Sequence, residues 1–134
     1  MQLDQITSEL LLKLKAQGYN KNRLTWYKSD KELTVVFAIQ KSAYGADLWY
    51  YCFGICINAL KPECKVISHC QIQHRIDMSY NGHNWTPDEI LTLLGKWVSM
   101  YGSMTELRTK AIEGNLPSYC TREALRYLTT VAFH

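Results

Sequence analysis

The sequence contains no hydrophobic run long enough to cross a bilayer. The longest run, residues 48–57, is about half the length of a transmembrane helix, and its residues are of types that favour strands. Residues 1–5 contain no basic segment leading into an apolar stretch, so no signal peptide is expected. These absences predict a soluble, cytoplasmic protein that does not bind membranes.

The chain also lacks a marked excess of charge of either sign. Its 15 lysines and arginines are set against 12 acidic residues, giving a net charge of +3 over 134 residues, and 47% of the residues are hydrophobic. This composition predicts one globular domain over residues 1–134 and excludes a disordered chain. Asp30 and Glu32 interrupt the basic residues of the N-terminal part, which favours a solvated face over a nucleic-acid site.

Cysteines are few and odd in number. An odd number cannot pair completely within one chain. Cys52 and Cys56 lie four residues apart in a strand-like run, where their Cα atoms are ~13 Å apart and cannot form a disulfide. Without an export signal, the sequence predicts free thiols in a reducing compartment. The five cysteines are Cys52, Cys56, Cys64, Cys70 and Cys120.

Helical periodicity marks both ends of the chain. Apolar residues at positions 6, 10, 11 and 14 predict a helix over residues 3–17, which Gly18 ends because glycine adopts the left-handed conformation easily. In the last third, two N-terminal capping sequences predict helices over residues 86–102 and 103–114. A last helix is expected to begin near residue 118 or 121, with an apolar stripe formed by Leu125, Leu128 and Val131.

Four strand-like runs lie between these helices, at residues 23–28, 33–40, 48–59 and 66–76. The third run is apolar on both faces, which is typical of a central strand, and Gly54 within it indicates a bulge or a close backbone approach. The order of elements predicts an α+β fold, with an N-terminal helix, a four-stranded antiparallel sheet and three C-terminal helices.

Motifs for phosphate binding and for a nucleophile elbow are absent from the sequence. Two cysteines and two histidines lie within residues 64–74, but on one strand Cys70 and His74 would be ~13 Å apart, too far for one metal ion. Half-buried strand residues are therefore expected at these positions, Cys64, His69, Cys70 and His74.

A cysteine–histidine nucleophile pair is geometrically possible across strands, between Cys52 or Cys56 and His74. No aspartate or asparagine stands out to orient the histidine, so buried structural cysteines are favoured. Asp47 and Asp77, the acidic residues near strand ends, are too far apart in the sequence to indicate an acid–base pair. The sequence therefore predicts no catalytic residue, no metal and no cofactor, and we expect that the protein is not an enzyme.

Aromatic residues gather in the strand region, at positions 26, 27, 44, 49, 50 and 51. Because neighbours alternate along a strand, both faces of the sheet must carry aromatic side chains. One face can pack against helices, while the other is either open for binding or covered by a second helical layer. Tyrosine, tryptophan and arginine are favoured at binding interfaces. The second face is expected to hold some of Tyr27, Trp49 and Tyr51 beside Gln71, Gln73 and Arg75.

Three segments carry a resemblance to a known family: Gln40-Lys41-Ser42 followed by Tyr44-Gly45, then Phe53-Gly54-Ile55, then Cys70-Gln71-Ile72-Gln73. Over about residues 10–78 the chain resembles a bacterial family of small cytosolic α+β proteins catalogued as a domain of unknown function, of the four-three-zero-four type. The chain departs from the family's usual pattern at Cys52-Phe53, and at Gln71, where the family often has histidine. The resemblance supplies no catalytic residues, and it implies a binding role because related small α+β proteins act as immunity proteins beside toxin genes.

The residues and the resemblance together favour an immunity protein that neutralises a cognate bacterial toxin domain without catalysis, of the kind used in contact-dependent growth inhibition. Inhibitors of nucleases are commonly acidic, so a net charge of +3 indicates either an acidic surface on the toxin or a local acidic patch on this chain. Lys41 is expected at the end of the sheet, where it either faces an anionic partner or belongs to a hairpin that sets the sheet register. The residues expected to contact the partner are Tyr27, Lys41, Tyr44, Trp49, Tyr51, Gln71, Gln73 and Arg75.

An alternative function is a small-molecule or nucleotide-binding domain, or an enzyme, with a pocket between the sheet and the C-terminal helices. Its candidate residues are Lys41, Tyr44, His74 and Arg75.

Overall fold

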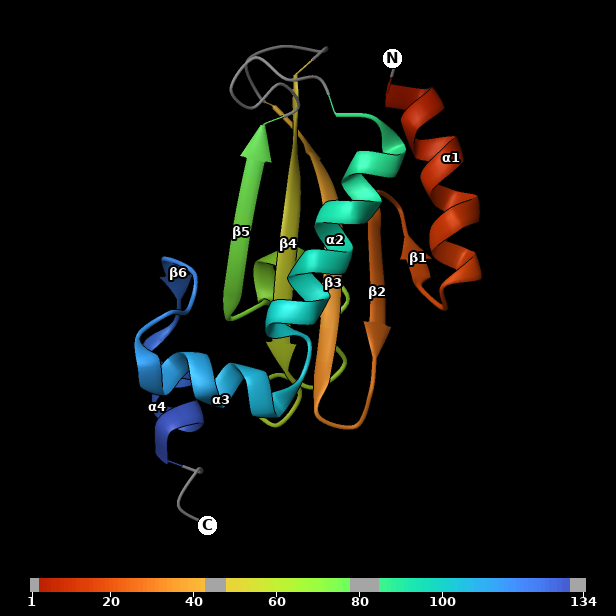
Figure 1. Ribbon diagram of the computed structural model, residues 1–134. Coiled ribbons are helices and arrows are strands. Elements are labelled where there is room, and N and C mark those ends of the chain that lie inside the picture. Colours follow the sequence, from red (N-terminus) through yellow and green to blue (C-terminus); the bar gives the residue numbers. More distant parts are fainter. Residues whose placement is uncertain (1–2, 43–47, 78–84, 131–134) are drawn as a thin grey trace.

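The computed structural model describes residues 3–42, 48–77 and 85–130 (Figure 1). Helices and strands follow one another in the order α1 (Leu3–Ala16), β1 (Asn20–Asn22), β2 (Thr25–Ser29), β3 (Leu33–Lys41), β4 (Trp49–Ile57), the 3₁₀ helix η1 (Ile67–His69), β5 (Ile72–Asp77), α2 (Pro87–Tyr101), α3 (Met104–Glu113), β6 (Tyr119–Cys120) and α4 (Arg122–Thr130). No helix in the described part of the chain is long and apolar enough to span a membrane.

The strands form one antiparallel sheet in the order β1-β2-β3-β4-β5-β6, so every strand pairs with its neighbours in the sequence. This confirms the predicted α+β class and antiparallel pairing, but the sheet has six strands and not four. β1 and β6 are three and two residues long, which is too short to produce a period-two pattern.

The predicted fourth strand over residues 66–76 is wrong in its first half. Ile67–His69 form η1, and β5 begins only at Ile72. The side chains of Ile67 and Cys70 turn inward and pack against the sheet, so this half of the segment crosses a face of the sheet and does not extend it.

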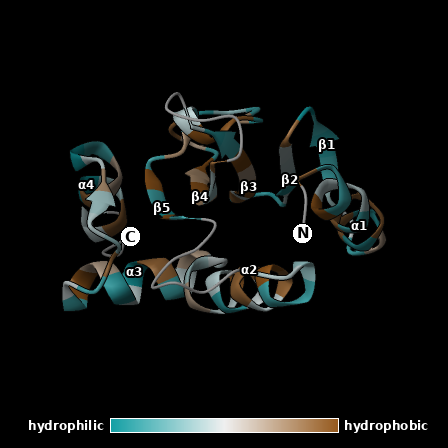
Figure 2. Cartoon of the chain, turned by 90° about the horizontal axis from the view of Figure 1, so that it is seen from above, coloured by the Kyte–Doolittle hydropathy of each residue, from teal (hydrophilic) through white to brown (hydrophobic). Residues whose placement is uncertain are grey.

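Helices α1 and α2 lie on one side of the sheet, with α3 beyond α2 (Figure 2). This helix side contains the main core, in which Trp26, Phe37, Phe53 and Trp97 form a chain of ring contacts with centroids 5.4–6.1 Å apart. The indole N–H of Trp97 donates to the carbonyl of Gly54 at 3.4 Å, which fixes α2 over β4.

The connection between β4 and β5, residues 58–71, covers part of the opposite face, which we call the outer face. A second buried cluster forms there from Val36, Ala38, Cys52, Cys56, Cys64, Ile67 and Cys70. A Cβ on Gly54 would lie 2.6 Å from Cδ1 of Ile67 and 2.7 Å from Sγ of Cys70. Of the two alternatives predicted at Gly54, the close approach is confirmed, because only glycine leaves room for this connection, and the bulge is wrong, because the strand register continues through Gly54.

The helix ends follow the capping signals in the sequence. Gly18 and Gly114 have φ values of +89° and +74°, and Thr86 and Glu89 form a complete capping box at the start of α2. In α4 the buried residues are Ala124 and Leu128, whereas Leu125 of the predicted stripe is 44% exposed. Val131, also in that predicted stripe, lies outside the described residues.

Replacing Gly54 tests whether the two layers depend on this close approach. We expect Gly54→Ala to lower the free energy of unfolding by about 1–3 kcal/mol, because the new methyl group overpacks a site filled by Ile67 and Cys70. The matched control is Gly95→Ala in α2, where nothing lies within 4 Å of an added Cβ. That change should raise the free energy of unfolding by about 0.5–1 kcal/mol. Urea denaturation measures both, and a Gly54→Ala protein as stable as the original would contradict this account.

Candidate functional site

The outer face remains open where β4, β5 and β6 meet. Because side chains alternate along a strand, β4 directs Tyr50 to this face, and β5 directs Gln73 and Arg75 to it. Tyr119 of β6 lies opposite Gln73 in the sheet register and is 53% exposed. We call this open region the Tyr50–Arg75 surface and define it by Gln40, Tyr50, Gln73, Arg75 and Tyr119.

The Tyr50–Arg75 surface combines a stacked cation with a shallow hollow. The Arg75 guanidinium lies 4.5 Å from the centroid of the Tyr50 ring, a cation–π distance that holds the charge at the surface. Within the described residues, no carboxylate forms an ion pair with Arg75. A hollow of about 300 Å³ lies beside it, lined by Gln40, Cys52, Gln73, His74, Arg75 and Tyr119.

The thiol of Cys52 lies at the base of this hollow and donates to Oε1 of Gln40 at 3.3 Å. Burial raises the pKa of Cys52 to about 11, although the nearby Arg75 charge acts in the opposite direction. A thiol with such a pKa stays protonated near neutral pH and is a poor nucleophile. Cys52 therefore supports the surface by packing.

Three more buried thiols, those of Cys56, Cys64 and Cys70, meet beneath the β4–β5 connection. The sulfur atoms of Cys64 and Cys70 are 3.8 Å apart, and the Cys56 thiol donates to the carbonyl of Lys61 at 3.3 Å. Hydrogen bonds from its two neighbours lower the pKa of Cys64 and raise the pKa values of Cys56 and Cys70. All five cysteines are free, and no metal-binding group of three or more ligands occurs among the described residues.

The sequence-based placement of Cys64 and Cys70 along one strand is thus wrong, since a turn of the connection brings them together. His69, from the same segment, is exposed.

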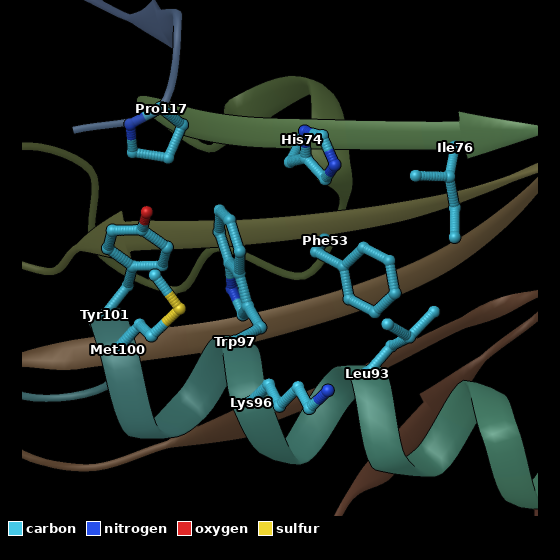
Figure 3. Close-up of a pocket in the computed structure, with 9 residues that line it drawn as sticks. All are labelled: Phe53, His74, Ile76, Leu93, Lys96, Trp97, Met100, Tyr101 and Pro117. Carbon is cyan, nitrogen blue, oxygen red and sulfur yellow. The ribbon is translucent and has the colours of Figure 1, made fainter. Parts of the chain in front are cut away.

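A second hollow, which we call the α2–β5 pocket, opens on the helix side (Figure 3). It has a volume of about 280 Å³, and mostly apolar side chains line it. The imidazole of His74 stacks on the Trp97 indole, with centroids 6.4 Å apart and planes 17° apart. Lys96 is exposed and adds a positive charge. The full lining is Phe53, His74, Ile76, Leu93, Lys96, Trp97, Met100, Tyr101 and Pro117.

The alternative function requires a pocket between the sheet and the C-terminal helices, and the α2–β5 pocket is such a pocket. Of the four residues predicted for that function, only one lines the pocket. His74 is that residue, whereas Arg75 points to the outer face. Lys41 is exposed at the end of β3 and is not part of the lining. Tyr44 lies outside the described residues.

Two of the predicted partner-contact residues lie on the helix side of the sheet and not on the outer face. Trp49 and Tyr51 point to the helix side and are only 6% and 1% exposed, within the main core. They share the direction of Phe53 and Ile55 in β4, the face that α2 covers. The residue between them, Tyr50, is the one that reaches the outer face.

Two glutamines of the predicted set hold the β4–β5 connection in place. Gln71 was expected on an open face but is buried, and its side-chain oxygen accepts a hydrogen bond from the Ile57 N–H at 2.8 Å. The Gln73 amide donates to the carbonyls of Ile67 and Cys70, at 2.9 Å each. Gln71 therefore has a structural role, and only part of Gln73 remains available to a partner.

Tyr27 and Arg75 lie on the outer face, as expected. Tyr27 is half-buried at the edge of the second cluster, with the Lys65 ammonium 6.0 Å from its ring centroid. Tyr119 was not predictable from the sequence, because only the pairing of β6 with β5 brings it to the surface, and a two-residue strand leaves no periodic signal.

The raised pKa of Cys52 predicts a loss of stability in alkali. The ordinary thiol pKa is 9.0, so between pH 9 and 11 the unfolded chain loses a proton that the native state keeps. The free energy of unfolding therefore falls as the pH rises, and Cys52 contributes about 2 kcal/mol of this loss by pH 10.5. Urea denaturation at pH 8 and pH 10.5 should show a smaller decrease for Cys52→Ala than for the original protein, and equal decreases would refute a buried, protonated thiol.

Comparison with known proteins identifies the family. The model of a family described as a domain of unknown function (DUF4304) matches residues 12–107, which include α2, the start of α3 and nearly all of the segment where the resemblance was noted. No curated protein matches the sequence, and no solved structure matches it. The match covers most of the chain, and the protein belongs to the DUF4304 family.

Proposed function

We propose that this protein is a binding protein without catalytic activity, and that it neutralises a cognate bacterial toxin domain by covering it with the Tyr50–Arg75 surface. The observation that carries the proposal is the exposed Arg75 guanidinium, which stacks on Tyr50 and has no carboxylate partner among the described residues. Tyrosine and arginine dominate the energetics of many protein interfaces. Tyr119 extends the same surface with a second ring.

The charge of this surface supports a partner of acidic character. Arg75 is held in place by the ring beneath it, so little side-chain entropy is lost when a carboxylate binds it. The hollow of about 300 Å³ next to Arg75 gives room for an inserted side chain. We therefore infer that the toxin domain presents a carboxylate to Arg75.

The five free cysteines support a cytoplasmic site of action for this proposed immunity function, because a reducing compartment keeps thiols unpaired.

The test is a calorimetric titration of the purified protein with the purified product of the neighbouring gene, which this proposal expects to be the toxin. We expect a tight complex that Arg75→Glu weakens at least tenfold, since the change places a carboxylate against the partner's acidic side chain. The matched control is Lys31→Glu, which makes the same change of charge in the turn between β2 and β3 and should bind normally. If no complex forms, the proposal of toxin neutralisation is wrong.

A second candidate function, binding of a small molecule, is favoured by the α2–β5 pocket. Its walls are mostly apolar and aromatic, Lys96 supplies positive charge, and the imidazole of His74 supplies ring nitrogens for hydrogen bonding. A cavity of about 280 Å³ is at the lower limit for ligand pockets, which suits a small aromatic acid better than a nucleotide.

A thermal-shift screen distinguishes the two candidates. A small aromatic carboxylate should raise the melting temperature by several degrees when present at about 100 times its Kd. Lys96→Glu should abolish that shift, whereas Lys31→Glu should leave it unchanged. If no aromatic acid, nucleotide or metal ion stabilises the protein, the small-molecule function is not supported.

A further inference from the structure

One edge of the sheet is incompletely paired. β6 pairs only with Ile72 and Gln73 at the start of β5. Within the described part of the chain, no strand pairs with the outer edge of the remaining β5 residues, 74–77 (Figure 1). These four residues present about 14 Å of free edge.

The direction of the backbone groups follows from the register. The Thr121 N–H donates to the carbonyl of Gln71 at 2.9 Å, so Gln71 directs its backbone groups away from β4. Because the direction alternates along a strand, Arg75 and Asp77 do the same. Their neighbours His74 and Ile76 pair with Phe53 and Tyr51 of β4. The N–H and C=O groups of Arg75 and Asp77 therefore point out from the sheet edge, and unpaired edge groups of this kind are what an added strand binds.

A hollow borders this edge on each face of the sheet. On the helix side, His74 and Ile76 line the apolar α2–β5 pocket. On the outer face, Arg75 and Tyr119 line the polar hollow of the Tyr50–Arg75 surface. A strand laid along β5 would direct successive side chains alternately into these two hollows.

We propose that the edge of β5 at residues 74–77 binds an extended segment of a protein partner by strand addition, with apolar side chains in the α2–β5 pocket and an acidic side chain between them facing Arg75. This inference rests on the proposed function, in which the partner is a protein. It names the part of the partner that is recognised: a segment in which apolar and acidic residues alternate.

Charge complementarity supports an acidic segment. Arg75 and Lys96 lie on the two sides of the edge, and neither forms an ion pair with a described carboxylate. Asp77 is exposed on the same face as Arg75, two residues further along, so the acidic residue of the segment must align with Arg75 and not with Asp77. This pair of opposite charges selects one register of the added strand.

A second copy of this chain is the competing occupant. Two β5 edges paired antiparallel about Ile76 would place Arg75 of each copy opposite Asp77 of the other. The edge shared by two such copies is only four residues long. An extended partner segment can carry apolar side chains large enough to fill the α2–β5 pocket while its backbone pairs with the edge. We therefore favour such a segment over a second copy of this chain.

The test uses a synthetic eight-residue peptide in which phenylalanine or valine alternates with glutamate. Titrated to millimolar concentration into ¹⁵N-labelled protein, it should slow hydrogen exchange of the Arg75 and Asp77 amides at least tenfold, because strand addition gives both amides acceptors. Two further peptides, N-methylated at either the odd or the even positions, supply the control. Only one of these two peptides should still bind, because every second N–H group of the bound peptide faces the edge and a methyl group there blocks pairing. If the parent peptide does not bind, or if both methylated peptides bind equally well, the inference is overturned.

Charge reversal gives a second, independent measurement. Arg75→Glu should weaken the glutamate peptide at least tenfold and strengthen a matched peptide with lysine in place of glutamate, whereas Lys31→Glu should change neither. Unchanged affinities would contradict the alignment with Arg75. A second copy would occupy the edge if two results appear together without peptide: slow hydrogen exchange of the Arg75 and Asp77 amides, and a concentration-dependent dimer in sedimentation. That outcome would overturn the proposal.

The outcome can be separated from that of the proposed function. A toxin complex in which the Arg75 and Asp77 amides still exchange rapidly would keep the proposed function and remove strand addition. A peptide that docks as described, with no binding by the toxin domain, would keep strand addition and remove the proposed partner.

Discussion

The packing of two layers against opposite sides of one glycine organises this molecule. Gly54 lies in β4, near the middle of the sheet, and its carbonyl accepts the hydrogen bond of the Trp97 indole from α2. On the other side, Ile67 and Cys70 of the β4–β5 connection occupy the space that a side chain would fill. Because both layers are anchored at β4, each of them covers β5 less completely, and the hollow of the Tyr50–Arg75 surface and the α2–β5 pocket lie on either side of β5.

Elements whose signals are local were predictable from the sequence. Thr86 and Glu89 specify the start of α2 through hydrogen bonds that span only three residues, and Pro87 favours this position through its fixed φ. Gly18 and Gly114 end helices through their own backbone conformation. A special role for Gly54 was also predictable, because a glycine in an apolar central strand indicates a bulge or a close approach, although the sequence did not decide between the two. At the helix ends the relevant contacts involve neighbours in the sequence, whereas at Gly54 the residue type alone carries the signal and its contacts, Ile67 and Cys70, lie further along the chain.

The parts that the sequence did not reveal depend on distant contacts. Alternation along β4 shows that Tyr50 and Tyr51 point to opposite faces of the sheet, but it does not show which face the helices cover. The sequence therefore predicts a surface position for Tyr51, which is buried, and none for Tyr50, which reaches the outer face. Gln71 appears polar and exposed in a strand pattern, yet it is buried because the connection folds back and gives it the Ile57 N–H as a partner. Tyr119 reaches the surface only through pairing between residues more than 40 positions apart.

The two ends of the sheet are unequal, and this limits how the protein can associate. At one end β1 is only three residues long, which makes it a poor template for an added strand, and α1 lies beside it (Figure 1). At the other end β5 extends four residues beyond its pairing with β6. Fibrous assembly through sheet edges requires a receptive edge at both ends, so that every newly joined unit offers a place for the next. Among the described residues, β5 alone offers an edge of this length, so the addition of one strand there leaves no comparable edge for the next unit, and growth terminates.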